Sequence, residues 1–192
     1  MNNIELYYWL FIRLLFHPKL LITDLRVNHR GYFALAAAFL SVATLTMGNT
    51  LVFGSRSGVG AWLAAATLSL TAFLFFALAY LPLVHLFGER HMPESRVTDL
   101  LVYAGFSLAP LLLLLPAAFL ALLLPAGGVY FYVAALIAAG LKIFINLLTG
   151  IKENYQLGSK KRALGIFFAP LATFVLLLVV NVLLSAFVFS HG

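Results

Sequence analysis

The sequence predicts an all-α integral membrane protein with five transmembrane helices, preceded by N-terminal amphipathic helices that lie at the membrane interface. Two observations carry this prediction. Hydrophobic residues make up 64% of the chain and charged residues 9%, with a mean hydropathy of +1.06, whereas soluble domains have about 45–50% apolar and 25% charged residues. Five apolar runs are also long enough to cross about 30 Å of hydrocarbon, which takes about 20 helical residues.

The chain divides into a charged N-terminal segment, residues 1–30, and a transmembrane domain, residues 31–192. In the first segment, apolar residues recur at helical spacing with Tyr7 and Trp9 among them, which predicts cytosolic interfacial helices that either anchor the chain to the membrane surface or dock a partner. The first, second and fifth apolar runs contain no charged residue. A short turn predicts a tight hairpin between the third and fourth helices. The five predicted spans cover approximately residues 32–53, 61–87, 100–124, 129–148 and 163–189.

The third run differs because prolines interrupt it. Pro110 and Pro116 each lack a backbone donor and free the carbonyl four residues earlier, at Phe106 and Leu112. Freed carbonyls need partners in lipid. We therefore predict that this helix is kinked, with Gly105 as part of the kink, and packed against its neighbours.

Basic residues lie mostly on one side of the predicted spans. Four precede the first span, two lie between the second and third, and four lie between the fourth and fifth, whereas Arg56 is alone on the other side. Because short cytosolic loops retain Lys and Arg, we predict a protein of the cell (inner) membrane with its N-terminus in the cytosol and its C-terminus outside. Either the charges only fix this topology, or they also bind anionic lipid headgroups through Arg13, Lys19, Lys160, Lys161 and Arg162.

One lysine lies within a predicted span. Lys142 is about 20 Å from the start of the fourth run and about 10 Å from its cytosolic boundary. A charge at mid-bilayer costs roughly 2.5–3.5 kcal/mol, so the side chain either extends to the interface along its aliphatic stem or lies in a polar pocket. For the second case we predict a cytosol-facing vestibule of His85, Asp99, Tyr103, Lys142 and Asn146, in which Asp99 or Tyr103 pairs with the ammonium.

No sequence motif indicates an enzyme. The chain lacks a Gly-rich phosphate loop, a His-Glu-x-x-His helix and a Gly-x-Ser-x-Gly elbow. It also lacks cysteine, and the two His and two Glu between residues 85 and 94 match no established metal-ligand spacing. The net charge of +6 is spread between apolar runs rather than gathered on one polar face. We therefore predict no catalysis, no cofactor, no metal site and no nucleic-acid partner.

Two short segments carry a family resemblance: residues 99–110, DLLVYAGFSLAP, and the step Arg162-Ala163 at the entry to the last span. With the polar N-terminal region and five closely spaced spans, they resemble the Yip family of Ypt/Rab-GTPase-interacting membrane proteins, in its bacterial branch. Members have a Gly-Tyr-Ser-Leu-x-Pro-like segment in the third span and Lys-Ala or Arg-Ala before the last. The Asp-Leu-Tyr-Gly-Pro segment of eukaryotic members is absent, so the resemblance does not extend GTPase binding to this chain.

The resemblance implies a non-enzymatic multi-pass membrane protein that organises the membrane or recruits partners and lipids. The residues leave a second class open, a small transporter or channel for an ion, a solute or a lipid. It would use the vestibule around Lys142 and the irregular third helix, since broken helices near polar residues often form such sites. Five spans preclude a simple inverted repeat within one chain, so transport would use a single bundle or a homo-oligomer.

Overall fold

The computed structural model describes residues 30–54, 59–93, 95–124 and 126–191, with most side chains as far as residue 180. The predicted interfacial helices of residues 1–30, including Arg13 and Lys19, lie almost wholly outside this part of the chain. The described elements are all helical: α3 (Arg30–Phe53), α4 (Val59–Phe75), the π-helical turn η2 (Phe76–Tyr80), α5 (Leu81–Glu89), α6 (Val97–Ser107), the 3-10 turn η3 (Ala109–Leu113), α7 (Leu114–Leu123), α8 (Gly128–Asn154) and α9 (Lys160–His191).

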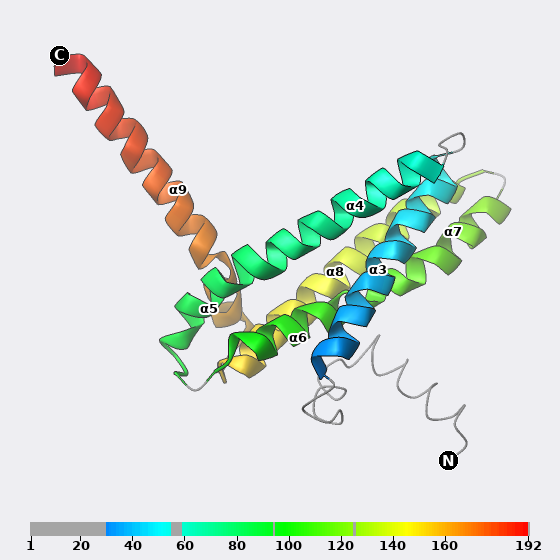
Figure 1. Ribbon diagram of the computed structural model, residues 1–192, viewed down its shortest axis with the longest axis horizontal. Coiled ribbons are helices and arrows are strands. Elements are labelled where there is room, and N and C mark those ends of the chain that lie inside the picture. The colour runs from blue at the N-terminus through cyan, green and yellow to red at the C-terminus, as the bar shows by residue number, and fades with distance from the viewer. Residues whose placement is uncertain (1–29, 55–58, 94, 125, 192) are drawn as a thin grey trace.

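Four helical segments run along one another in a bundle (Figure 1). Helix α3 packs against α4, α6 and α7, while α8 packs on the other side of α6 and α7. By length and composition, four segments in the described part of the chain can cross a membrane. They match the first four predicted spans: Gly31–Phe53, Trp62–Glu89, Val97–Leu123 and Gly128–Asn154. The protein is thus a multi-pass membrane protein.

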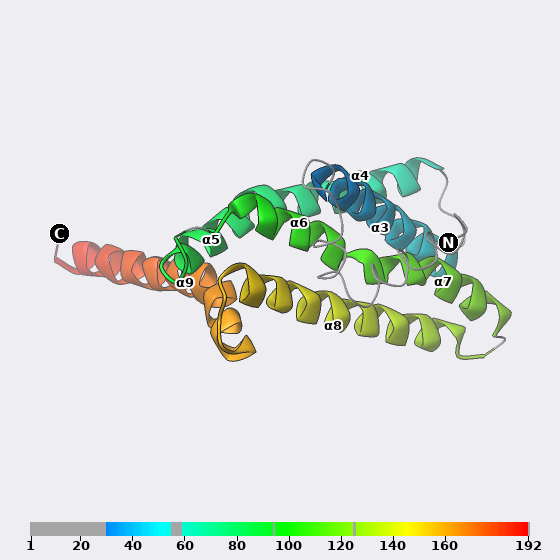
Figure 2. The ribbon, with the colours of Figure 1, turned by 90° about the horizontal axis from the view of Figure 1, so that it is seen from below.

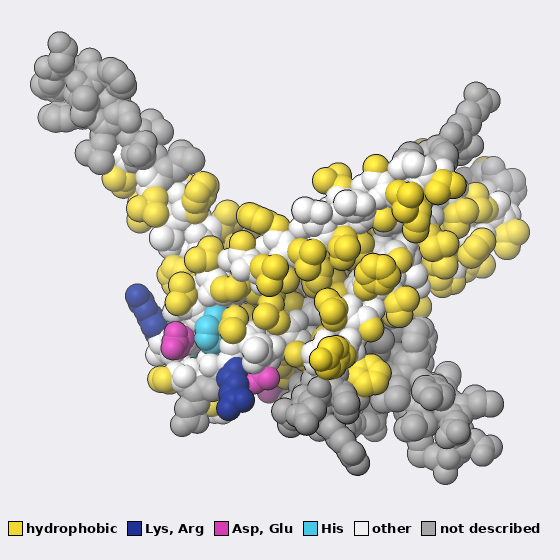
Figure 3. Space-filling view, viewed as in Figure 1, with side chains coloured by type: hydrophobic (Ala, Val, Ile, Leu, Met, Phe, Trp, Pro, Cys, Tyr) yellow, Lys and Arg dark blue, Asp and Glu magenta, His cyan; other side chains and the backbone are white. Residues whose placement is uncertain are grey.

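The two ends of the bundle differ in polarity. Helix α5 ends, α6 begins and α8 leads to α9 at one end, which we call the charged end. On the face shown in Figure 3, the Lys, Arg, Asp, Glu and His side chains gather there, and apolar side chains cover most of the rest. Such an apolar surface is what surrounding hydrocarbon requires.

The second span is not one regular helix, although its sequence is a clean apolar run. Pro82, in the first turn of α5, has no backbone N–H, and its ring would collide with the carbonyl of Leu78 in a regular helix. The preceding turn widens instead, so that the N–H of Leu81 reaches the carbonyl of Phe76 five residues earlier. The apolar pattern missed this turn because hydropathy does not register a proline near the end of a run.

The third span breaks where the sequence predicts. Helix α6 ends at Ser107, and Pro110 lies in the 3-10 turn η3 that follows. A threonine of another helix contacts this turn: Thr44 Oγ1 lies 3.0 Å from the carbonyl oxygen of Leu111 and 2.9 Å from that of Ser41 in its own helix. The Leu111 carbonyl also accepts the backbone N–H of Leu114. Pro116 lies in the first turn of α7, where a backbone N–H has no partner within the helix, so a proline costs little there.

Three tyrosine side chains pack closely against glycines in helices. In each case a Cβ added to the glycine would collide with the tyrosine side chain, so only glycine permits the contact. The hydroxyl of Tyr132 also donates a hydrogen bond of 3.0 Å to Asn49 Oδ1, which holds α8 against α3. The three pairs are Gly48 with Tyr132, Gly88 with Tyr155 and Gly150 with Tyr103.

Helix α9 contacts the bundle only through its first part. The Phe167 ring lies 5.4 Å from that of Tyr80 and 5.7 Å from that of Phe144, and Tyr80 donates a hydrogen bond of 2.6 Å to the carbonyl of Phe167. Pro170 is buried, but every side chain described between residues 171 and 180 is exposed, and α9 points away from the bundle (Figures 1 and 2). The fifth predicted span, residues 163–189, lies in this helix, which is not among the four segments above, so it stays a prediction.

Candidate functional site

Tyr155 holds the charged end together. It directly follows α8, is only 1% exposed, and packs on Gly88 of α5. Its hydroxyl lies 2.7 Å from Nδ1 of His85. Burial raises the pKa of Tyr155 to about 12, against a smaller lowering by a hydrogen bond with Asn154 and with a small rise from the negative charge of Glu89, so the hydroxyl keeps its proton at neutral pH. The contact fixes α5 against the junction of α8 and α9.

Helix α9 starts with three consecutive cations on this fixed junction. Lys160, Lys161 and Arg162, which we call the basic turn, are exposed, and Ala163 directly after them is fully buried. Positive charge in the first turn of a helix opposes the helix dipole, and no acidic residue compensates in that turn. The basic turn therefore does not stabilise α9 by charge, and its side chains are exposed to anions.

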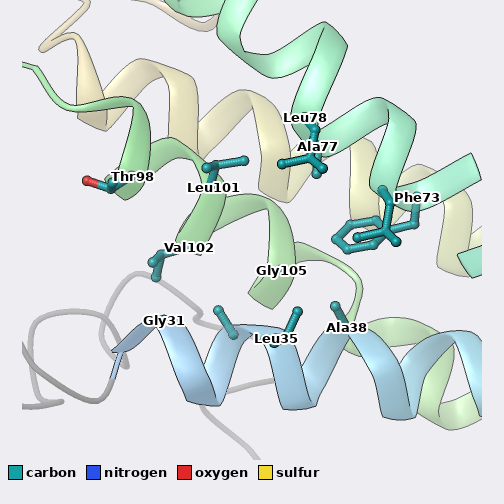
Figure 4. A pocket seen from close by; sticks show the side chains of 12 residues that line it. Gly31, Leu35, Ala38, Phe73, Ala77, Leu78, Thr98, Leu101, Val102 and Gly105 are labelled. Atoms are coloured by element: carbon teal, nitrogen blue, oxygen red, sulfur yellow. The ribbon is translucent and has the colours of Figure 1, made fainter. Parts of the chain in front are cut away.

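An apolar groove opens between α3, the α4–η2 segment and α6, with a volume of about 300 Å³ (Figure 4). Gly31, Thr98 and Val102 lie at one end of the groove, whereas Ala38 and Phe73 lie at the other. Its floor is narrow because α3 and α6 approach closely at Gly105, where an added Cβ would lie 2.7 Å from the carbonyl oxygen of Ala34. Gly105, two residues before the end of α6, therefore allows α6 to pack closely against α3.

A second groove, of about 270 Å³, lies between the broken third span and α8. One charged side chain lines it, that of Lys142, and we call it the Lys142 groove. The other lining residues are apolar: Pro110, Leu113, Leu114, Ala117, Ala135, Ala138 and Ala139. The groove therefore places one cation beside apolar surface within the membrane.

The register of α6 against α8 separates Lys142 from both predicted partners, Asp99 and Tyr103, since Tyr103 lies level with Gly150, about 12 Å from Lys142 along the helix axis. Tyr103 packs on Gly150, where an added Cβ would lie 2.9 Å from Tyr103 Cβ, and the two helices run in opposite directions. Asp99 lies one turn from Tyr103 toward the charged end, and Lys142 lies two turns from Gly150 the other way. At 1.5 Å per residue, Asp99 and Lys142 are about 18 Å apart along the helix axes.

The predicted vestibule residues accordingly do not gather at one point. His85 contacts Tyr155, and Lys142 forms no hydrogen bond or ion pair with any residue that the structure describes. Asn146 is 7% exposed, and within the described chain its side-chain N–H groups have no acceptor. Among the same residues, no three His, Asp or Glu side chains are placed to share a metal ion.

Two residues that matter here escaped the sequence analysis. Tyr155 lies in a polar loop, and its only signal was an aromatic ring among charged residues. Thr44 gave no signal, because a threonine in an apolar run usually bonds to its own helix, as Thr46 does with the carbonyl of Val42 and as Thr44 also does with that of Ser41. Both act through partners more than 60 residues away in the sequence.

Comparison with known proteins gave one match. A family model described as Yip1 domain matches residues 12–181, which include the four spans, the basic turn and both grooves. No curated protein and no solved structure matches the chain. The bacterial branch of the family stays a prediction.

Proposed function

Because the chain belongs to the Yip1 domain family, we propose that it is a non-enzymatic membrane protein that organises the membrane by recruiting lipids or partners at its charged end. The observation that carries this proposal is the basic turn. Three exposed cations are held at a fixed place on the bundle, at an electrostatic cost to their own helix. Such an arrangement suits the attraction of anionic lipid headgroups, at about 1 kcal/mol for each cation.

The anchoring of α9 supports this role. The buried residues Ala163 and Ile166 and the ring contacts of Phe167 fix the first turns of α9 to α5 and α8. Because the backbone of these turns is already ordered, binding a headgroup costs only the freedom of the cationic side chains, so more of the attraction remains as affinity. In the same proposal the charged end faces the cytosol of a cell (inner) membrane, and α9 is the fifth span, which places the C-terminus outside.

The test compares two triple variants that lose the same charge. K160Q/K161Q/R162Q removes the basic turn, and R90Q/R96Q/K152Q removes three other cations of the charged end. Each protein is purified in detergent with phosphatidylglycerol and phosphatidylcholine, and the retained lipids are measured by native mass spectrometry. We expect wild type and the second variant to retain phosphatidylglycerol preferentially and the first variant to lose most of that preference.

This assay separates lipid binding from a role in topology alone. A solubilised protein has no orientation, so cations that only fix the topology would leave lipid retention unchanged in all three proteins. Equal loss in both variants would instead show that net charge matters and that the basic turn has no special role. Either result contradicts the proposal.

Transport, the alternative, has weaker support because the vestibule residues lie in separate places. Its test uses the absence of cysteine from the chain. Single cysteines placed along α6 and α8 are treated with membrane-impermeant thiol reagents. A labelled stripe through positions 103, 142 and 145 would favour a conduit, and labelling confined to loops would favour the proposed role.

A further inference from the structure

Lys142 carries a charge that the described part of its own chain does not neutralise. The side chain is half-buried in the fourth span and has no hydrogen bond or ion pair with a described residue. An ammonium in hydrocarbon is costly unless it reaches water or meets an anion. The position therefore requires either an aqueous contact or an acidic partner from outside the described chain.

A second copy of the chain could not supply that partner at the same depth. The sequence has six acidic residues, and none lies in the interior of a span. Those in the spans lie in the first or last turn, about 16 Å or more along the helix axis from the depth of Lys142. The six are Glu5, Asp24, Glu89, Glu94, Asp99 and Glu153.

The surroundings of Lys142 match the two parts of a phospholipid. On the side away from the charged end, the groove continues along Ala135 and Ala138 of α8, facing Leu113 and Ala117. Small side chains leave space there for an acyl chain. On the other side, the aliphatic stem of Lys142 can carry its ammonium toward the interface, where lipid phosphates lie.

We propose that the Lys142 groove binds one anionic glycerophospholipid from the leaflet at the charged end. The ammonium of Lys142 contacts the phosphate region, and an acyl chain lies on the alanine-lined floor between η3–α7 and α8. The 3-10 turn at Pro110 contributes by displacing the start of α7, which forms one wall of the groove. The site is separate from the basic turn and does not rest on the function proposed above.

The experiment measures which lipid lies next to the groove. Both native tryptophans are replaced by phenylalanine (W9F/W62F), and a single reporter is introduced as Leu113→Trp, at a groove position that is 44% exposed. The protein is reconstituted in phosphatidylcholine with dibrominated phosphatidylglycerol or dibrominated phosphatidylcholine, whose bromines quench tryptophan on contact. We expect the reporter to favour phosphatidylglycerol by about fivefold, the effect of one cation near the headgroups.

Matched variants assign the preference to Lys142. With K142Q we expect the ratio to fall to about one, whereas K142R should keep it, because a guanidinium retains the charge. A reference reporter, Leu68→Trp on the exposed surface of α4, should show a ratio of about one. K160Q/K161Q/R162Q should leave the ratio at the groove unchanged, which separates this site from the basic turn.

Three results would overturn the inference. The first is an equal ratio at the two reporters, and the second is a ratio at the groove that survives K142Q. The third is stronger quenching by a dibrominated fatty acid than by dibrominated phosphatidylglycerol, because the occupant would then be a free carboxylate.

Discussion

Replacing Gly105 by alanine tests whether helices α3 and α6 rest on each other through the missing side chain. The new Cβ would lie 2.7 Å from the carbonyl oxygen of Ala34 and 3.0 Å from its Cβ. Backbone atoms cannot rotate away, so one helix must shift by several tenths of an ångström. Overpacking of this kind costs about 1–3 kcal/mol, and the higher helix propensity of alanine offsets about 1 kcal/mol of it. We expect a net loss of up to about 2 kcal/mol.

Gly140 provides the matched control. It lies in the middle of α8, and an added Cβ would meet no atom within 4 Å, so Gly140→Ala should keep the gain in propensity and leave packing unchanged. The free energies of unfolding are compared by titration with SDS in mixed micelles, followed by circular dichroism. If the Gly105 variant proves as stable as the Gly140 variant, the close approach of α3 and α6 is not the reason for glycine at position 105.

Three further predictions concern the contacts that hold the bundle together. Thr44→Val should lower the free energy of unfolding by about 1 kcal/mol, because the side chain loses its hydrogen bonds to the carbonyls of Ser41 and Leu111, and with the second of them a link between α3 and η3; Thr44→Ser should restore most of the loss in the same SDS titration. Tyr155→Phe should lower the thermal midpoint by removing the hydrogen bond to His85, and an unchanged midpoint would show that packing on Gly88 suffices. The folded-state pKa of Tyr155, about 12, lies above the ordinary 10, so the folded state holds its proton more tightly than the unfolded state. That stability is present below pH 10 and is lost as pH rises through 12; the wild-type midpoint should fall more steeply over this interval than that of Tyr155→Phe, and parallel curves would refute the assignment.

The sequence predicts those structural features well that depend on a single segment of the chain, such as the position of a span or of a helix break. Apolar runs located the four spans to within about three residues, because a lipid-facing helix must be apolar along its length, except that the fourth helix continues past the predicted end at 148 to Asn154. Pro110 located the break in the third span, because a missing backbone donor acts on its own turn. Pro82 had the same effect on the second span and could have been recognised on the same grounds.

Contacts between two segments, such as the proposed pairing of Lys142 with a residue of α6, could not be predicted. The vestibule was built from residues on one side of the membrane, but the register of α6 against α8 depends on Tyr103 meeting Gly150. A shift of one turn in that register would have brought Asp99 closer to Lys142. Depth follows from counting residues along one helix, whereas pairing requires the packing surfaces of both.

The contacts between tyrosines and glycines have a consequence for how this sequence can diverge. Neither partner of such a pair can change freely, since a larger residue at Gly88 has no room while Tyr155 is present. A smaller residue in place of the tyrosine would leave a void. Substitutions there should show strong epistasis: alanine at position 88 is harmful alone and tolerated beside leucine at position 155. Among homologues, these positions should covary as couples, and a coupling signal between them would report the helix register directly.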